Sequence, residues 1–411
     1  MLRLLHTADW HLGHQLHGVD RAHEHRCFLD WLLNVLEAEQ VDALLIAGDV
    51  FASANPPVAA QAMFYEFLAT ARRRCPQLNM VIIAGNHDSP ARLEAPAPLF
   101  RGINARVVGL LPRSGRDFQP ERLLVPLTDR RGEVAAVCAA VPFLRPADLP
   151  VVAEDGDIDP LVEGVRQIYR EAADAARRQL ASHQALVLTG HCYLARASLS
   201  ELSERKVLRG NQHALPPEIF PQDCAYTALG HLHLAQWLGR QHLRYSGSPL
   251  PLALDERRYN HQVVLADLDG PACADIRTLP VPRTVPIHCV PDTGPVPLDA
   301  VLARLKALEL PQVAPECRPL LDIQVLLEQP EPTLRRQVEE ALADRPARLA
   351  RIQVHYTGSG GSLADSVPVQ ELATLDPEAV FRRRYAQFYE DDPDRALLDA
   401  FHGLLEEIQG K

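Results

Sequence analysis

The sequence lacks a long apolar run. Of its 411 residues 47% are hydrophobic, but no uninterrupted apolar stretch approaches the 18 or more residues that a membrane-spanning helix needs. The first residues, Leu2 to Leu5, indicate a strand and not a charged region followed by a signal-peptide core. We therefore expect a cytoplasmic protein that does not span a membrane.

Closely spaced cysteines are also missing. The eight cysteines are scattered along the chain, and none belongs to a Cys-x-x-Cys pair. This pattern favours reduced thiols over a disulfide framework, and several thiols, such as Cys138, lie in apolar surroundings. Cys192 stands beside a candidate metal ligand, but we interpret it as a spacer.

Lysine is scarce, and the net charge of −11 is of the wrong sign for a simple nucleic-acid binder. Lysine occurs only at 206, 306 and 411, so arginine supplies nearly all the positive charge. Together with frequent alanine and proline, this preference indicates coding bias. Any binding to DNA must therefore come from local patches, a metal centre or a partner.

A short pattern is present several times: a buried strand, a glycine, and then polar side chains. Its clearest example is the apolar run Val81 to Ala84, followed by Gly85 and by Asn86-His87-Asp88. Glycine permits a sharp turn, an amide oxygen can ligate a hard cation, and an imidazole can protonate a leaving group. The alternative is an ordinary turn with an incidental histidine.

Polar residues also follow four other apolar segments, in three of them directly after a glycine. Their polar residues are Asp9 and His11, Asp49, His191, and the pair His231 and His233. Residues two apart in extended backbone share one face, so Asp9 pairs with His11 and His231 with His233. An Asp–His hydrogen bond in a loop, or Asp49 as a helix N-cap, would be the structural alternatives.

Collected, these residues predict a two-metal site. Ligands in α/β proteins gather at the carboxyl ends of strands. Two carboxylates, one amide and four imidazoles exceed what one ion needs, but suit two octahedral ions that share a carboxylate. The seven candidates are Asp9, His11, Asp49, Asn86, His191, His231 and His233. Mixed oxygen and nitrogen ligands without thiolate favour Mn²⁺, and His87 remains as a proton donor.

The rest of the chain predicts alternating helices and strands. Helices are expected at 58–74, 161–182, 298–308 and 332–343, and another begins near His23 and His25, which we place at its surface or rim. Strands are expected near 106–111, 134–142, 263–268, 320–327 and 349–356. Prolines between 280 and 297 suggest a boundary, and Gly358 to Ser362 a linker.

Two amphipathic helices are expected in the tail, at 377–389 and 395–408. They carry aromatic residues and lie beyond the linker, where little of this chain is left to cover them. We interpret them as a segment that docks on a partner. Packing back onto the preceding small domain is the alternative.

The motifs together resemble the calcineurin-like metallophosphoesterase superfamily. In chain order they are Asp-x-His, Gly-Asp-Val-Phe, Gly-Asn-His-Asp, Gly-His and Gly-His-x-His. The opening Leu-His-Thr-Ala-Asp-Trp-His-Leu-Gly and the stretch Gly-Ser-Pro-Leu-Pro-Leu-Ala-Leu-Asp-Glu at 247–256 narrow the resemblance. They are similar to the nuclease subunits that work with a coiled-coil ATPase of the SbcC type.

This resemblance implies a fold and a domain order. The expected fold is α/β, with a four-layer αββα phosphoesterase core at 1–282. A small α+β capping domain at 283–357 would contact DNA. Residues 358–411 would form a linker and helices that dock on the ATPase, in a heterotetramer containing two copies of this chain.

The resemblance also implies an activity and roles for the site residues. Asp9, His11, Asp49 and His233 would hold one Mn²⁺, Asp49, Asn86, His191 and His231 the other, and His87 would assist the leaving group. The implied reactions are ATP-dependent double-strand exonuclease and single-strand or hairpin endonuclease cleavage, in DNA repair, recombination and replication.

Two departures and two rival functions accompany the resemblance. Ala52 follows Gly-Asp-Val-Phe where relatives often have an acid, and Cys192-Tyr193 could narrow the pocket beside His191. A small-molecule phosphodiesterase could use the same core, but it would need neither the extra domain nor the tail. A non-catalytic scaffold that binds DNA ends would not need the complete ligand set.

Overall fold

The computed structural model describes residues 1–115, 117–151, 159–195, 197–198 and 214–357, with residues 378, 381, 382, 385, 393, 397, 398 and 401. The chain divides into two compact units. One comprises Met1–Val325 with Pro332–Gln353, and the other Leu326–Glu331 with Val354–Lys411. Among the described residues, none of the helices combines the length and the apolar character that crossing a membrane requires.

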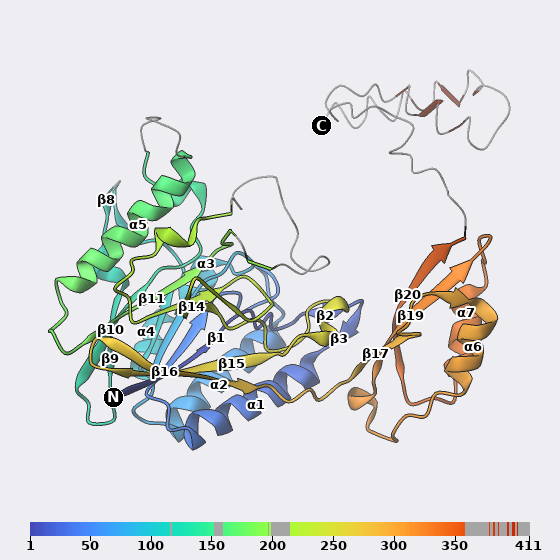
Figure 1. Ribbon diagram of the computed structural model, residues 1–411, viewed down its shortest axis with the longest axis horizontal. Helices are drawn as coiled ribbons and strands as arrows, with labels where there is room; N and C mark the ends of the chain where they lie inside the picture. The colour runs from blue at the N-terminus through green and yellow to red at the C-terminus, as the bar shows by residue number, and fades with distance from the viewer. Residues whose placement is uncertain are drawn as a thin grey trace. The chain divides into compact units, whose positions relative to one another are not determined.

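Two six-stranded sheets form the centre of the larger unit (Figure 1). The first has the order β16-β15-β1-β4-β5-β6, with β1, β4, β5 and β6 parallel. Its strands are β1 Leu2–Thr7, β4 Ala43–Ala47, β5 Asn79–Ile83, β6 Ala105–Val108, β15 Gln262–Asp269 and β16 Ala272–Pro280.

The second sheet has the order β13-β14-β12-β11-β10-β9, and its middle strands β10, β11, β12 and β14 are parallel. Its strands are β9 Leu124–Thr128, β10 Val134–Ala140, β11 Ala185–His191, β12 Tyr226–Gly230, β13 Gln236–Leu238 and β14 Arg240–Tyr245. The carboxyl ends of the parallel strands carry the polar residues that the sequence analysis singled out.

Helices cover the outer face of each sheet. Helices α1 (Ala22–Ala38) and α2 (Val58–Arg74) bury residues such as Phe28, Leu32 and Phe64 against the first sheet. Helix α5 (Pro160–Arg177) packs on β9, β10 and β11 of the second sheet. The layers therefore run helix, sheet, sheet, helix, which confirms the predicted αββα architecture.

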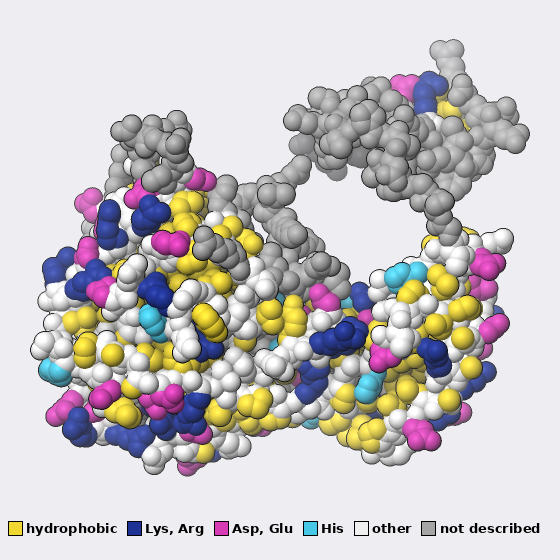
Figure 2. Space-filling view, in the orientation of Figure 1, with side chains coloured by type: hydrophobic (Ala, Val, Ile, Leu, Met, Phe, Trp, Pro, Cys, Tyr) yellow, Lys and Arg dark blue, Asp and Glu magenta, His cyan; other side chains and the backbone are white. Residues whose placement is uncertain are grey.

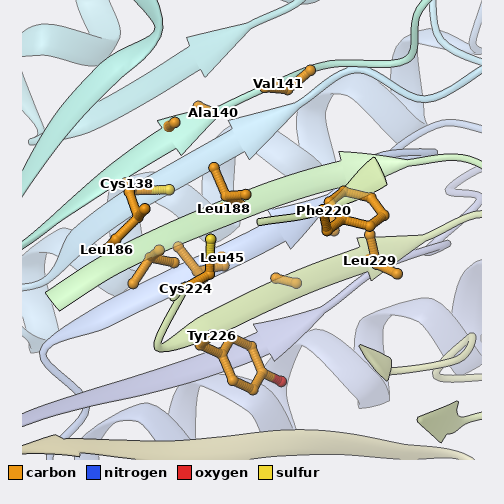
Figure 3. Packing of buried hydrophobic residues seen from close by; sticks show 14 of the residues in the cluster. Leu45, Cys138, Ala140, Val141, Leu186, Leu188, Phe220, Cys224, Tyr226 and Leu229 are labelled. Carbon is orange, nitrogen blue, oxygen red and sulfur yellow. The ribbon is translucent and has the colours of Figure 1, made fainter. Parts of the chain in front are cut away.

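Apolar side chains fill the space between the two sheets (Figure 3). Leu45 of β4 lies in the same fully buried cluster as Cys138 of β10, Leu188 of β11 and Leu229 of β12. Strands that are covered on both faces are apolar at successive positions, as all five residues of β4 are. This continuous core fixes the two sheets face to face and so aligns the ends of their strands.

After the two-sheet core, the chain forms a smaller α+β region with its own sheet. Its sheet contains β17 (Ile287–Val290), β19 (Leu320–Leu327) and β18 (Val296–Pro297) in this order, and β20 (Arg348–Tyr356) pairs with β19. Helices α6 (Leu298–Lys306) and α7 (Leu334–Leu342) pack on each other. The shorter elements of the chain are β2 Gln15–Leu16, β3 Val19–Asp20, α3 Pro90–Glu94, α4 Ala97–Gly102, β7 Arg113–Ser114 and β8 Asp117–Phe118.

Some sequence expectations need correction. The helix expected at 161–182 ends at Arg177, and strand β16 was missed because its exposed polar residues and closing proline resemble a loop. His25 is buried, not at the rim. The linker and the two tail helices lie outside the continuous described residues. The domain limits at 282 and 357 stay a prediction.

Candidate metal centre

The loops after β1 and β4 run side by side and are joined by backbone hydrogen bonds. The Asp9 N–H donates to the Gly48 carbonyl and the His11 N–H to the Asp49 carbonyl, each at 3.0 Å. Strand β4 also pairs with β5, whose extension carries Asn86 and His87. The polar residues of three neighbouring strand ends are thus held at one edge of the first sheet.

Four of the candidate residues have backbone in the left-handed region. The φ angles are 55° at Asp9, 46° at His11, 49° at Asp49 and 101° at His231. Residues other than glycine rarely adopt such angles, and those that do are concentrated at functional sites. The turns therefore aim side chains inward at a cost that the surrounding core must offset.

Glycines allow close approach between strand ends at this edge, both within the first sheet and between the two sheets. A Cβ at Gly85 would lie 2.1 Å from Asp49 Oδ1, and one at Gly230 would lie 1.9 Å from the Ala47 carbonyl oxygen. Gly48 combines a φ of 93° with a Cβ position only 2.3 Å from His191 Nδ1. At Gly85, close approach and not backbone freedom is therefore the requirement, which corrects the reason inferred from sequence.

One group of ligand atoms comes from Asp9, His11 and His233, which all lie within 4.8 Å of one another. His11 Nε2 is 3.5 Å from Asp49 Oδ2. This nitrogen is buried and has no hydrogen-bond partner among the described residues. A buried polar atom without a partner costs free energy unless a ligand satisfies it.

A second group surrounds Asn86. Its amide oxygen is 2.9 Å from His191 Nε2 and 3.0 Å from His231 Nδ1. Asp49 Oδ2 is 3.3 Å from the same His191 nitrogen. The structure therefore gathers all seven predicted ligand candidates, with Asp49 between the two groups.

Burial and charge oppose each other in this cluster. Burial raises the pKa of Asp9 to about 7. Burial alone would also raise the pKa of Asp49, but the charges of His191 and His11 hold it below its ordinary value. For His191, burial is outweighed by the Asp49 carboxylate, and its pKa rises to about 9. Negative charge at this place favours any cation, whether a proton or a metal ion.

These residues fit a pair of divalent cations. Carboxylate, amide and imidazole groups are the donor types that Mn²⁺ and similar ions accept. The unsatisfied His11 nitrogen is a lone-pair donor inside the cluster. The Nδ1–H of His191 donates to the Ala47 carbonyl at 2.9 Å, which leaves Nε2 as a possible metal ligand.

His87 lies at the open side of the cluster. It is exposed, and its ring is 4.8 Å from that of His11, centre to centre. The Nδ1–H donates to the Ala52 carbonyl at 3.2 Å, so Nε2 is available for a substrate. Because Ala52 contributes only its backbone here, the missing acid at this position does not disturb the contact.

Asp88 contacts backbone N–H groups and not the His87 ring, in the interactions that the structure describes. Its carboxylate accepts the N–H groups of Gly85 at 2.9 Å, Phe51 at 2.9 Å and Val50 at 3.1 Å. Burial raises the pKa of Asp88 to about 6. Asp88 therefore fixes the loops after β4 and β5 relative to each other.

Sequence reasoning missed Glu256. This side chain is fully buried, and its Oε1 accepts the His233 Nδ1–H at 2.8 Å, while Oε2 accepts the Leu252 N–H at 2.6 Å. The bond through Nδ1 orients the His233 ring, and Nε2 is the atom that would ligate a metal. Glu256 is the last residue of the stretch 247–256, which supports the family resemblance. No local sequence pattern links it to His233.

A pocket opens beside His191 and His231. It is lined by apolar and aromatic side chains, among them Phe143, Tyr193 and Leu215, together with Cys192. Burial raises the pKa of the Cys192 thiol to about 12. Cys192 and Tyr193 thus shape the space next to His191.

Comparison with known proteins gives two family matches. Residues 2–234 match the calcineurin-like phosphoesterase family, and residues 283–389 match the Type 5 capsule protein repressor C-terminal domain, SbcD_C. The chain is 40% identical to the D subunit of the nuclease SbcCD from Rhodobacter capsulatus, over 92% of this chain and 93% of the relative. It is 30% identical to that of Escherichia coli K12 over 100% and 99%. It is 35% identical to that of Bacillus subtilis over 65% and 66%.

Proposed function

The chain belongs to the SbcD family of calcineurin-like phosphoesterases, and from this premise we propose how it acts on DNA. It is a metal-dependent nuclease subunit, a phosphodiesterase whose cofactors are divalent metal ions. We assign the second subunit to a coiled-coil ATPase of the SbcC type, in a cytoplasmic heterotetramer with two copies of this chain. ATP-dependent exonuclease cleavage of double strands and endonuclease opening of hairpins are the proposed reactions.

The observation that supports this proposal most strongly is the convergence on Asp49. Asp9, His11, Asp49 and His233 would hold one ion, and Asp49, Asn86, His191 and His231 the other. The short contacts from Asp49 Oδ2 to His11 Nε2 at 3.5 Å and to His191 Nε2 at 3.3 Å put one carboxylate between the two groups. The absence of thiolate from this set favours Mn²⁺.

The metal ions and the protein side chains would contribute different parts of the reaction. When bound, two divalent ions would supply positive charge to the phosphodiester and make a water more acidic. The side chains hold their positions through Glu256 on His233 and the Ala47 carbonyl on His191. His87, steadied by the Ala52 carbonyl, would donate a proton from Nε2 to the departing oxygen of the DNA strand.

The chain has a net charge of −11, so its overall charge does not attract DNA. DNA must therefore be recognised by local groups of side chains. On the face drawn in Figure 2, basic and acidic side chains of the described residues are interspersed. Counterion release from a few phosphates, together with the metal centre, would then supply the affinity. We expect binding that weakens with salt and that depends on the ATPase partner.

The deciding experiment measures cleavage of a DNA hairpin by the purified chain, with and without the ATPase. Each reaction is run with Mn²⁺, with Mg²⁺ and with a chelator. We expect manganese-dependent nicking that the partner and ATP enhance. A small phosphodiester such as bis(p-nitrophenyl) phosphate is assayed in parallel, to report on the metal centre alone.

The two rival functions give different results in this experiment. Hydrolysis of the small phosphodiester without any DNA cleavage, even with the partner, would favour a small-molecule phosphodiesterase. Stable association with the ATPase and with DNA ends, but without hydrolysis of either substrate, would favour a scaffold. Either result would refute the nuclease proposal.

A further inference from the structure

A second cluster of metal-binding side chains lies outside the centre described above. His23 and Cys27 are one turn apart on α1, and Cys317 ends the short 3-10 turn Pro315–Cys317. The Cys27 sulfur is 3.5 Å and the Cys317 sulfur 3.3 Å from the same nitrogen, His23 Nε2. All three residues are partly buried.

Hydrogen bonding alone does not account for this arrangement. An imidazole nitrogen has either one lone pair or one proton, so Nε2 can form one well-directed hydrogen bond. Two thiols approach it at nearly equal distance, and a thiol is itself a weak donor and a weak acceptor. One of the two contacts is therefore poorly satisfied unless a third group joins the cluster.

The two nitrogen–sulfur distances, 3.5 and 3.3 Å, match those between neighbouring ligands of one tetrahedral zinc ion. With Zn–N of about 2.0–2.1 Å and Zn–S of about 2.3 Å, neighbouring N and S ligands lie about 3.5 Å apart. A helical pair spaced four residues apart and a third ligand from another segment form a common zinc arrangement. We propose that His23, Cys27 and Cys317 bind one Zn²⁺, with water as the fourth ligand.

The cluster joins segments that are 294 positions apart in sequence, both within the larger compact unit. Within this unit, a buried apolar cluster packs residues that precede position 282 against residues of the small α+β region. Its members are Leu16, Leu254, Val285, Ile287 and Leu320. The three ligand atoms do not all lie within 4.8 Å of one another. One thiol must therefore rotate toward the other before both can bind the same ion. Bound zinc would thus clasp the 315–317 turn to α1.

Cobalt substitution tests the site without relying on nuclease activity. The reduced full-length chain, freed of metal, is titrated with Co²⁺ while the near-ultraviolet absorbance is recorded. Thiolate bound to Co²⁺ gives a charge-transfer band that a centre of carboxylates, amide and imidazoles cannot give. We expect the band to reach the amplitude of one thiolate-bound cobalt per chain, beside any cobalt held at the centre around Asp49, and to disappear when Zn²⁺ is added.

Matched cysteine variants identify the ligands. The double variant Cys27→Ser/Cys317→Ser should lose the band, and His23→Ala should require more cobalt to produce it. The control Cys75→Ser/Cys289→Ser replaces two other partly buried cysteines and should keep it. A native chain without the band, or a Cys27→Ser/Cys317→Ser variant that retains it, would overturn the proposal. So would a disulfide between Cys27 and Cys317 that forms in place of zinc uptake. None of these three results would affect the proposed nuclease function.

Discussion

His87 is the side chain whose proposed role is separable from metal binding. Its Nδ1 is engaged by the Ala52 carbonyl, and its ring lies at the exposed side of the cluster. A general acid contributes about 10²- to 10⁴-fold to a rate. We expect His87→Ala to lose DNA cleavage by about this factor while still binding both metal ions, as measured by calorimetric titration with Mn²⁺.

The control for this variant is His288→Ala, which removes another exposed imidazole. It should keep both cleavage and metal content. His87 lies within 4.8 Å of His11 and Asp49, counted between ligand atoms, so a role as a ligand is the competing explanation. Loss of both ions from His87→Ala would establish that explanation and remove the proton-donor role.

Glu256 acts on the metal centre through His233. Because it fixes the ring by accepting from Nδ1 at 2.8 Å, its loss should weaken metal binding by about 10- to 100-fold. We expect this from Glu256→Gln in Mn²⁺ titrations. Glu94→Gln is the matched control, since Glu94 also accepts a backbone N–H, from Gly109, but belongs to neither group of candidate ligands. Equal affinities in the two variants would exclude the positioning role.

At the scale of single residues, the sequence predicts groups that contact a ligand better than groups that support them. Asp9, Asp49 and Asn86 stand directly after apolar strands, so their approximate place follows from the strand pattern. Glu256 and Asp88 act through contacts with distant backbone or side chains, at separations such as 23 residues from His233. No spacing along the chain encodes those contacts.

At the scale of elements, the close approach of the loops after β4 and β5 depends on Gly85. A Cβ there would lie 2.1 Å from Asp49 Oδ1 and 2.4 Å from the Asp49 backbone nitrogen. Overpacking of this kind costs about 1–3 kcal/mol. We expect Gly85→Ala to lower the thermal midpoint and to weaken Mn²⁺ binding. Gly102→Ala, where no atom lies within 4 Å of the new Cβ, should change neither by a comparable amount.

His6 on β1 links the two sheets and gives their packing a pH dependence. Its Nε2–H donates to the Leu229 carbonyl at 3.1 Å, and the Tyr226 hydroxyl donates to Nδ1 at 3.0 Å. Burial, followed by the charge of Arg244, lowers the pKa of His6 to about 3. As pH falls from about 6.5, the unfolded chain takes up this proton and the folded chain does not, so stability is lost.

The expected contribution is up to about 1.4 kcal/mol per pH unit between the unfolded and folded pKa values. His6→Gln removes it, so the free energy of unfolding should fall less steeply with decreasing pH than in the native chain. Urea titrations between about pH 5 and 7 measure the difference in slope. Identical slopes would show that His6 titrates alike in both states.

The sequence predicts elements closely where apolar residues recur at a regular spacing, and it does not where they lack one. Helix α2 has the predicted bounds of Val58 and Arg74, because its apolar face repeats at helical spacing and Asn55-Pro56-Pro57 precedes it. Strand β16 pairs antiparallel with β15 through eight residue pairs, yet all nine of its residues are partly or fully exposed. Backbone pairing with β15, not an apolar pattern, makes it a strand.

At the scale of the whole molecule, the two-sheet core explains why one chain can assemble ligands from positions as distant as 9 and 233. Each sheet alone presents an incomplete set: Asp9, Asp49 and Asn86 come from the first, and His191 and His231 from the second. The buried cluster between β4, β10, β11 and β12 holds these sets together. Stability of the core and affinity for metal should therefore change together in variants of that cluster.

The tail supplies the last prediction. Residues from 366 onward follow a linker and carry two predicted amphipathic helices, whose apolar faces suit a groove on a partner. Deleting them should abolish co-purification with the ATPase, because the docking segment is lost. Hydrolysis of bis(p-nitrophenyl) phosphate should persist, because all seven candidate ligands and His87 lie before residue 234. Retained co-purification would refute the docking role, whereas loss of hydrolysis as well would show that the tail also supports the core.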